Sequence, residues 1–196
     1  MRSVPLILRL DVTGKAIGWK NWQEAVCLYA KDRVVWSIGE IELSFTGGIS
    51  RLTGLQSKMS INSIIAVKGS DQHLTLNKTV PPLSNTELFL RDGHMCMYCG
   101  TQLPDHQLTR DHVIPLYQGG KNRWTNLVAA CKSCNARKGG RTPEQAGMPL
   151  LAVPYAPNWA EYLLLTNRRI LADQMEFLRA QVGKNSRFNI NHQPKK

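Results

Sequence analysis

The sequence predicts an α+β protein, and three observations support this class. Short β-branched and aromatic segments lie in the N-terminal part, two Cys-x-x-Cys motifs lie in the middle, and a helical apolar stripe lies near the C-terminus. The 196 residues suffice for one domain, or for one domain with an appendage. With 42% hydrophobic residues the chain can bury a core, so wholesale disorder is not expected.

The N-terminal part is expected to form short strands around one helix. β-rich segments predict strands over 6–12, 33–38 and 63–67. Asn21, with Glu24 three residues later, forms a capping-box pattern that predicts a helix over 22–30. The Gly-, Ser- and Thr-rich segment 47–60 has little periodicity and is interpreted as a loop. We therefore expect a small N-terminal α/β region over residues 1–80, with no role that the sequence reveals.

A single helix is predicted near the C-terminus. Apolar residues recur at three- and four-residue spacing from Trp159 to Phe177, with Asn158 as a candidate N-cap and Gly183 as a candidate end. Such a stripe favours core packing over a partner interface. This helix and the basic tail after it form the expected C-terminal element, residues 146–196.

The middle of the chain is expected to be a separate module. A Pro-Pro pair at 81–82 favours extended structure and marks its boundary. Residues 84–91 are predicted to form a short helix that leads into it. The module is assigned to residues 84–145.

Charge and hydropathy predict the location of the protein and the class of its binding partner. The chain carries 25 Lys and Arg against 14 Asp and Glu, a net charge of +11, which predicts attraction to polyanions such as nucleic acids. The excess is +3 over 1–90, +4 over 91–146 and +4 over 147–196, so it is denser in the second half. No apolar run is long enough for a membrane span or a secretory signal, so a cytoplasmic protein without membrane contact is expected.

Four of the five cysteines form two pairs, Cys96 with Cys99 and Cys131 with Cys134. Each spacing lets two thiolates bind one tetrahedral ion, and four thiolates suit a structural Zn²⁺. Two disulfide bonds or a redox motif are the alternatives, and a cytosolic chain disfavours the disulfides. The fifth cysteine, Cys27, lies among apolar residues and is expected to be a buried free thiol.

The residues between and after the two pairs form a longer pattern. The first C-x-x-C is followed by D-H-V-x-P-L at 111–116, by a Gly-Gly loop ending in N-L at 126–127, and by C-x-x-C-N-x-x-K-G at 131–139. Over about residues 88–143 this array resembles the HNH nuclease family, whose fold is called ββα-metal. Asn135 stands where the family has His or Asn, which makes this an H-N-N version.

The resemblance implies a role for each residue of the motif. Asp111 and Asn135 would hold a catalytic divalent cation, Mg²⁺ or Mn²⁺, and His112 would be the general base. Asn126 would tie down the loop between the two strands and so orient His112. These residue types suit the chemistry, because histidine titrates near neutral pH and a hard cation prefers oxygen ligands. Neighbours on a strand face opposite sides, so Asp111 and His112 can share a site only at a strand end or a bulge, and the following Pro115 agrees with a strand end.

The implied function is metal-dependent endonucleolytic hydrolysis of DNA phosphodiester bonds. Double-stranded DNA is the expected partner, and a homodimer or a protein partner through the N-terminal region stays open. Four basic side chains are candidate DNA contacts: Arg110, Arg123, Arg137 and Lys138. Trp124 could stack on a base or pack against the adjacent strand.

A second class of protein shares most of these features. A non-catalytic zinc-ribbon module that binds nucleic acid would also use the four cysteines and the positive charge. Only the enzyme needs Asp111, His112 and Asn135 together, so their joint presence favours the nuclease.

Overall fold

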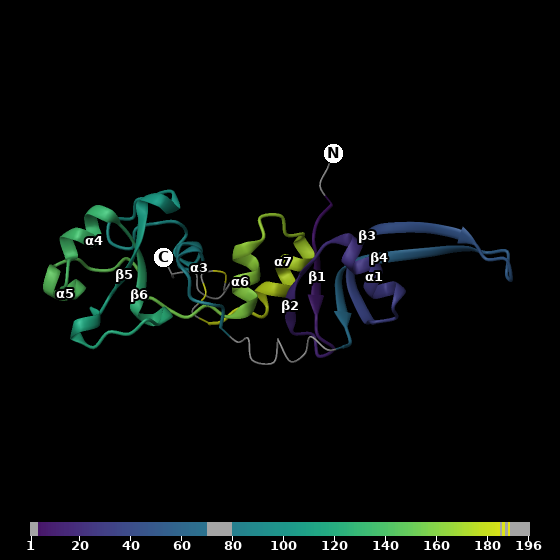
Figure 1. The fold of residues 1–196 in the computed structure, drawn as a ribbon, viewed down its shortest axis with the longest axis horizontal. Helices are drawn as coiled ribbons and strands as arrows, with labels where there is room; N and C mark the ends of the chain where they lie inside the picture. Colours follow the sequence, from purple (N-terminus) through teal and green to yellow (C-terminus); the bar gives the residue numbers. More distant parts are fainter. Residues whose placement is uncertain (1–3, 70–79, 185, 187, 189–196) are drawn as a thin grey trace, which may run out of the picture. The chain divides into compact units, whose positions relative to one another are not determined.

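The computed structural model describes residues 4–69, 80–184, 186 and 188, and the chain divides into two compact units (Figure 1). The first unit comprises described residues within 1–79, 159–182 and 188–196, and the second lies within 80–158 and 183–187. Among the described residues, no helix has the length and apolar character that crossing a membrane requires.

A four-stranded sheet forms the centre of the first unit. Its strands, in spatial order, are β2 (Ala16–Lys20), β1 (Ile7–Leu10), β4 (Gln56–Val67) and β3 (Val34–Ile49). The pairing of β1 is antiparallel with β2 and parallel with β4, while β3 and β4 form an antiparallel hairpin. The sequence did not predict β2.

Helix α1 (Trp22–Ala30) begins at the predicted capping box. Asn21 Oδ1 accepts a hydrogen bond from the backbone N–H of Glu24 at 2.8 Å, and the Glu24 carboxylate accepts one from the Asn21 N–H. Ala25 supplies the buried face of the helix. Cys27 lies on its exposed side, so the expectation of a buried thiol was wrong.

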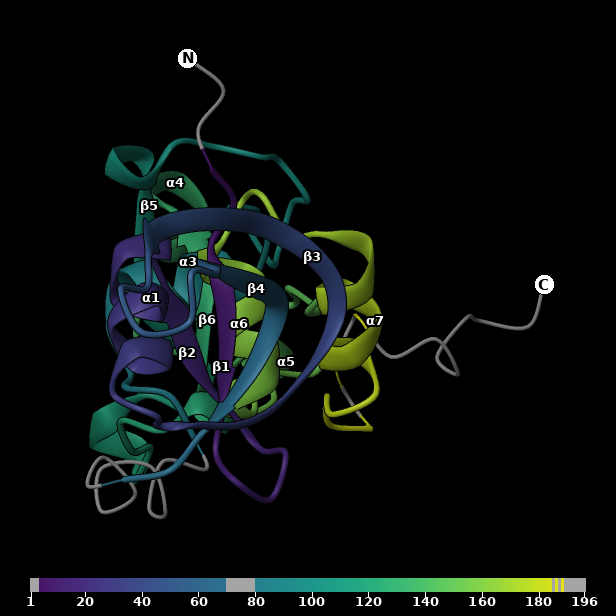
Figure 2. The same cartoon turned by 90° about the vertical axis from the view of Figure 1, so that its right-hand side faces the viewer.

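The segment interpreted as a loop, 47–60, contains the ends of two strands instead. β3 continues to Ile49 and β4 begins at Gln56, and Figures 1 and 2 show both strands running on together beyond β1 and β2. Pairing continues to Ile49 opposite Gln56, with several shifts of register along the hairpin, the last between Thr46 and Ile49. The prediction failed because Gly and Ser carry little β-propensity, whereas here the backbone ladder between the two strands sets the structure.

Two helices replace the single predicted C-terminal helix: α6 (Trp159–Thr166) and α7 (Ala172–Arg179). Asn167, between them, accepts a hydrogen bond from the N–H of Arg169 at 3.0 Å, an Asx turn that competes with helix continuation. The apolar faces of both helices pack on the sheet, as the stripe predicts. Leu163, Leu164 and Leu178 belong to one buried cluster with Leu8, Leu10 and Ile64 of the sheet.

The second unit is built on a β-hairpin and a helix. Its elements are α3 (Asn85–Arg91), β5 (Leu108–His112), β6 (Leu127–Cys131), α4 (Lys132–Lys138) and α5 (Pro143–Ala146), with 3₁₀ turns at Asp105–Gln107, Leu116–Gln118 and Trp124–Asn126. β5 and β6 pair antiparallel from Leu108 opposite Cys131 to His112 opposite Leu127. α4 follows β6 directly, which gives a ββα arrangement within an α+β fold, as predicted.

Candidate metal centre and catalytic cleft

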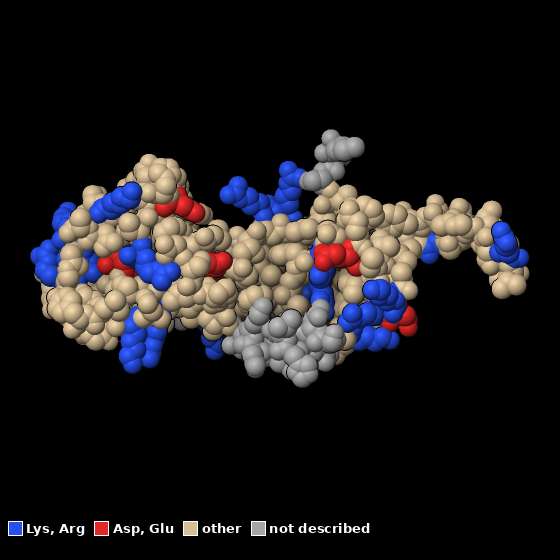
Figure 3. Space-filling model, in the orientation of Figure 1, with Lys and Arg blue, Asp and Glu red and all other residues tan. Residues whose placement is uncertain are grey.

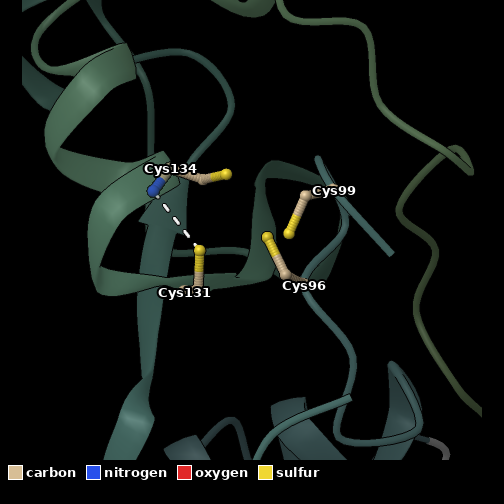
Figure 4. Close-up of side chains that lie close together, drawn as sticks. All are labelled: Cys96, Cys99, Cys131 and Cys134. Carbon is tan, nitrogen blue, oxygen red and sulfur yellow. Dashed lines mark hydrogen bonds between the residues drawn. The ribbon is translucent and has the colours of Figure 1, made fainter. Parts of the chain in front are cut away.

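The four paired cysteines converge on one point, and their sulfur atoms all lie within 4.8 Å of one another (Figure 4). Cys96 and Cys99 come from a turn closed by the bridge between Met95 and Gln102. Cys131 ends β6, and its sulfur accepts a hydrogen bond from the N–H of Cys134 at 3.3 Å in the first turn of α4. The arrangement offers one ion four sulfur ligands.

The surroundings of these thiols raise the pKa of some and lower the pKa of others. Burial, together with neighbouring sulfur atoms, raises the pKa of Cys134 to about 12, and burial also raises the pKa of Cys96. The Thr101 hydroxyl, 3.3 Å from Cys99 Sγ, lowers the pKa of Cys99 to about 6. Four thiolates this close repel one another, and a bound cation removes that penalty. The donor set therefore fits a thiophilic metal ion such as Zn²⁺.

Five of the sequence-predicted site residues line one cleft of about 360 Å³: Arg110, Asp111, His112, Asn135 and Lys138. β5 ends at His112, so two neighbouring residues can both reach the cleft at the end of the strand. Asn135 enters it from α4, one residue after Cys134. The same α4 turn thus carries a sulfur of the cysteine cluster and an amide of the cleft.

The carboxylate of Asp111 is buried, with 5% of the residue exposed, and each of its oxygens has a partner. Lys138 Nζ donates to Oδ1 at 2.9 Å, and the Tyr98 hydroxyl donates to Oδ2 at 2.5 Å. Burial and the adjacent carboxylate raise the pKa of Tyr98 above its ordinary value, so the phenol stays neutral and remains a donor. A carboxylate has about four lone-pair positions, so two accepted hydrogen bonds leave room for a cation.

The structure gives Lys138 a different place from the one the sequence suggested. The side chain is buried, and Nζ also donates to the carbonyl oxygen of His112 at 2.8 Å. Lys138 lines the cleft together with Asp111, and its ammonium has two protein acceptors there. These contacts give it a structural role at Asp111, and the DNA contact expected from the sequence stays a prediction.

The imidazole of His112 is oriented by a residue that sequence reasoning did not assign. Nε2 of His112 lies 2.8 Å from Asn122 Oδ1. An amide oxygen only accepts hydrogen bonds, so this pair requires the ring proton on Nε2 in the neutral imidazole. Nδ1 is then the basic nitrogen, which is the form a general base needs.

The amide of Asn135 is held by its nitrogen. Nδ2 donates to Thr109 Oγ1 at 2.9 Å and to the carbonyl oxygen of Arg110 at 3.4 Å. The Thr109 hydroxyl in turn donates to the carbonyl oxygen of Ala130 at 3.0 Å. Within the described part of the chain, Asn135 Oδ1 receives no hydrogen bond, so this oxygen and the Asp111 carboxylate offer a hard cation the ligands it prefers.

Asn126 does not line the cleft, and its side chain spans the loop that follows His112. Oδ1 accepts from the N–H of Ile114 at 2.8 Å, while Nδ2 donates to the carbonyl oxygens of Ile114 and Lys121 at 3.0 and 3.1 Å. Gly120 is required beside it, because a Cβ there would lie 1.8 Å from the Ile114 carbonyl oxygen. These are bonds by which a side chain fixes a loop.

The remaining basic candidates differ in exposure. Arg123 and Arg137 are exposed, whereas Arg110 is half-buried. Lys and Arg side chains form several separate patches on the face of the second unit in view in Figure 3. Trp124 is buried, and its indole N–H donates to the carbonyl oxygen of Pro81 at 3.1 Å, so it packs in the core.

Sequence reasoning missed Tyr98, Thr109 and Asn122 as members of the site. Tyr98 lies inside the first C-x-x-C motif, which is the one sequence signal that could have pointed to it. Thr109 and Asn122 carry no spacing signal, because their importance depends on which side chains the hairpin and its loop bring opposite them.

Residues 96–151 match the model of a family described as HNH endonuclease. The hairpin of β5 and β6, helix α4 and all the residues that line the cleft lie within this segment.

Over 70 residues, this chain is 39% identical to a protein named CRISPR-associated endonuclease Cas9 from Actinomyces naeslundii. That match covers 33% of this chain and 6% of the relative, so the chain corresponds to a small part of that protein. A crystal structure of the Type II-C Cas9 enzyme from the same organism aligns with a TM-score of 0.30 and 22% identity, over 56% of this chain and 13% of that one.

Proposed function

We propose that this protein is a metal-dependent endonuclease that hydrolyses phosphodiester bonds in DNA. The observation that carries the proposal is the convergence of Asp111, His112 and Asn135 on one cleft beside the four-cysteine cluster. The HNH family match of this segment supports a nuclease. A module that only binds nucleic acid would not need this combination of a carboxylate, an imidazole and an amide.

Two metal ions belong to the proposal. Cys96, Cys99, Cys131 and Cys134 would hold a structural Zn²⁺, since four sulfur ligands leave no position for water or substrate. Asp111 and Asn135 would hold Mg²⁺ or Mn²⁺ through their oxygens. When bound, that cation would stabilise the negative charge that develops on the phosphate.

The general base of the proposed reaction is His112. Its Nδ1 takes a proton from a water molecule as the water oxygen bonds to phosphorus, and the bond from phosphorus to the 3′ oxygen breaks. The 3′ oxygen leaves with the bonding electron pair and takes up a proton from solvent water, so the products are a 5′-phosphate and a 3′-hydroxyl, and the proton on His112 is released to solvent afterwards. Asn122 keeps the ring in the required tautomer, and Asn126 holds the loop that follows His112. Tyr98 and Lys138 each donate a hydrogen bond to Asp111 and so orient its carboxylate.

Double-stranded DNA is the proposed substrate, because the chain has a net charge of +11 and Arg123 and Arg137 are exposed on the second unit. The first unit would then be the part that a second copy or a protein partner binds. Reduced thiols at the cysteine cluster fit a cytoplasmic location.

A plasmid-cleavage assay tests the proposal. Wild-type protein and His112→Ala are incubated with supercoiled DNA in Mg²⁺, Mn²⁺ or EDTA, and His106→Ala serves as a control because His106 is exposed outside the cleft. We expect metal-dependent nicking or linearisation by the wild type and the control, and none by His112→Ala. DNA binding without cleavage in either metal would favour the zinc-ribbon binding module instead.

A further inference from the structure

The hydroxyl of Tyr98 joins two sites that are otherwise separate. Its backbone lies between Cys96 and Cys99 in the cysteine cluster, while its oxygen lies 2.5 Å from Asp111 Oδ2 in the cleft. Thirteen positions of sequence separate Tyr98 from Asp111. Among the described residues, Tyr98 is the one member of the C-x-x-C turn that forms a hydrogen bond with that carboxylate.

The position of Tyr98 is fixed on both sides by backbone hydrogen bonds. The N–H of Gly100 donates to the carbonyl oxygen of Cys96 at 2.9 Å, which closes the turn that contains Tyr98. The N–H of Met97 donates to the carbonyl oxygen of Ala129 at 2.8 Å, which ties the turn to β6. The phenol ring is half-buried against the cluster formed around Cys96 and Met148. The hydroxyl is therefore presented to Asp111 by a backbone that the cysteines organise.

The carboxylate of Asp111 depends on this hydroxyl for its orientation. Lys138 Nζ lies at one oxygen and Tyr98 at the other, so the two donors together set the rotation of the carboxylate plane. Removing the phenol oxygen would leave one buried carboxylate oxygen without its partner and free the plane to rotate. Groups outside the reach of a metal ion commonly set ligand orientation, and their loss weakens metal binding.

We propose that Tyr98 is a positioning residue that couples the cysteine cluster to the cation site of the cleft through Asp111. The inference rests on the proposed function, because it takes Asp111 as a cation ligand. It means that a metal ion in the cysteine cluster strengthens cation binding in the cleft. Since such coupling is reciprocal, cation binding in the cleft should also slow loss of the ion from the cysteines.

The variant Tyr98→Phe separates this role from packing, because it keeps the ring and removes only the hydroxyl. Tyr29→Phe is the matched control: Tyr29 lies in the first unit, and its hydroxyl finds no hydrogen-bond partner among the described residues. Both variants are prepared with Zn²⁺, and the zinc content and melting temperature of each are measured first. We expect zinc content close to that of the wild type in both, and a melting temperature that falls by a few degrees only in Tyr98→Phe, because a buried carboxylate oxygen loses its donor.

Binding of Mn²⁺ alone, followed by electron paramagnetic resonance without DNA, is the deciding measurement. We expect the affinity of Tyr98→Phe for Mn²⁺ to fall by about tenfold, the lower end for loss of an outer partner of a metal ligand, while Tyr29→Phe keeps wild-type affinity. Cleavage by Tyr98→Phe should need a correspondingly higher Mg²⁺ concentration and reach a near wild-type rate at saturation.

Three outcomes would overturn the inference. The first is an unchanged Mn²⁺ affinity in Tyr98→Phe. The second is loss of zinc from Tyr98→Phe, which would make Tyr98 a part of the structure of the cysteine cluster. The third is Mn²⁺ binding by Asp111→Ala with the affinity of the wild type. The proposed function fails on different grounds. If the wild type binds Mn²⁺ through Asp111 and yet cuts no DNA, the nuclease proposal is refuted while the Tyr98 coupling stands or falls on Mn²⁺ binding.

Discussion

Lys138 and Asp111 form a buried ion pair across the cleft, with 2.9 Å between Nζ and Oδ1 and side chains that are 1% and 6% exposed. The ammonium also caps the end of β5 by donating to the carbonyl oxygen of His112. One lysine near the end of α4 therefore neutralises a buried carboxylate and fixes the backbone of the neighbouring histidine. This links the stability of the second unit to the arrangement of the cleft.

Replacing Lys138 by Met should destabilise the second unit by about 3–5 kcal/mol, because it leaves the carboxylate of Asp111 buried without its counter-charge. Lys132→Met is the matched control, since Lys132 is exposed on the same helix. Its free energy of unfolding should stay within about 0.5 kcal/mol of the wild type. Urea unfolding measures both, and equal stabilities of the two variants would show that the buried pair contributes little.

The burial of Lys138 could not be predicted from the spacing of residues in the sequence. A lysine in the last turn of a helix is ordinarily a solvated charge, and its buried partner lies 27 positions earlier on β5. The convergence of the four cysteines was predictable, because each C-x-x-C motif brings two sulfur atoms into one turn. The partners of His112 and Asn135 depend on loop and hairpin geometry, which no local pattern specifies.

The fold of the first unit was less predictable than that of the second for a related reason. Strand segments rich in Val and Ile were found, whereas the continuation of β3 and β4 through Gly47 and Ser57 depends on cross-strand pairing rather than on residue type. Likewise, apolar periodicity continues through residues 167–171, so it predicted one helix where an Asx turn at Asn167 separates two.

Asn122→Ala should reduce the rate of cleavage without weakening cation binding. Without the acceptor at Asn122 Oδ1, the His112 ring no longer favours the tautomer with a basic Nδ1. We expect the single-turnover rate at saturating Mg²⁺ to fall by roughly 10- to 100-fold, part of what general-base catalysis contributes. The Mg²⁺ concentration for half-maximal rate should not change.

Gln107→Ala serves as the control for Asn122→Ala, because it removes an exposed amide outside the cleft. A wild-type rate in Asn122→Ala would show that another group sets the tautomer of His112. A higher Mg²⁺ requirement would place Asn122 near the cation instead.

Removing metal from the cysteine cluster should unfold the second unit selectively. Without a bound ion the four sulfur atoms repel or must take up protons, so Cys131→Ser or chelation should lower the melting transition of this unit by more than about 10 °C. Cys27→Ser is the control, because Cys27 is exposed in the first unit. Ligation needs thiolates, so zinc should be retained at neutral pH and released as the pH falls. A transition that is indifferent to chelation would rule out a structural metal.

Binding of DNA should depend on Arg123 and Arg137 through their charge. Both are exposed on the HNH module, so each can neutralise a phosphate and release a counterion. Arg123→Ala and Arg137→Ala should each lower the slope of log affinity against log salt concentration by about 1, with little change between DNA sequences. Fluorescence anisotropy in EDTA, from low to physiological salt, measures this without cleavage. Arg179→Ala is the control, because Arg179 is exposed on α7 in the first unit, and this variant should keep the wild-type slope. A slope that falls equally in all three variants would mean that DNA also contacts the first unit.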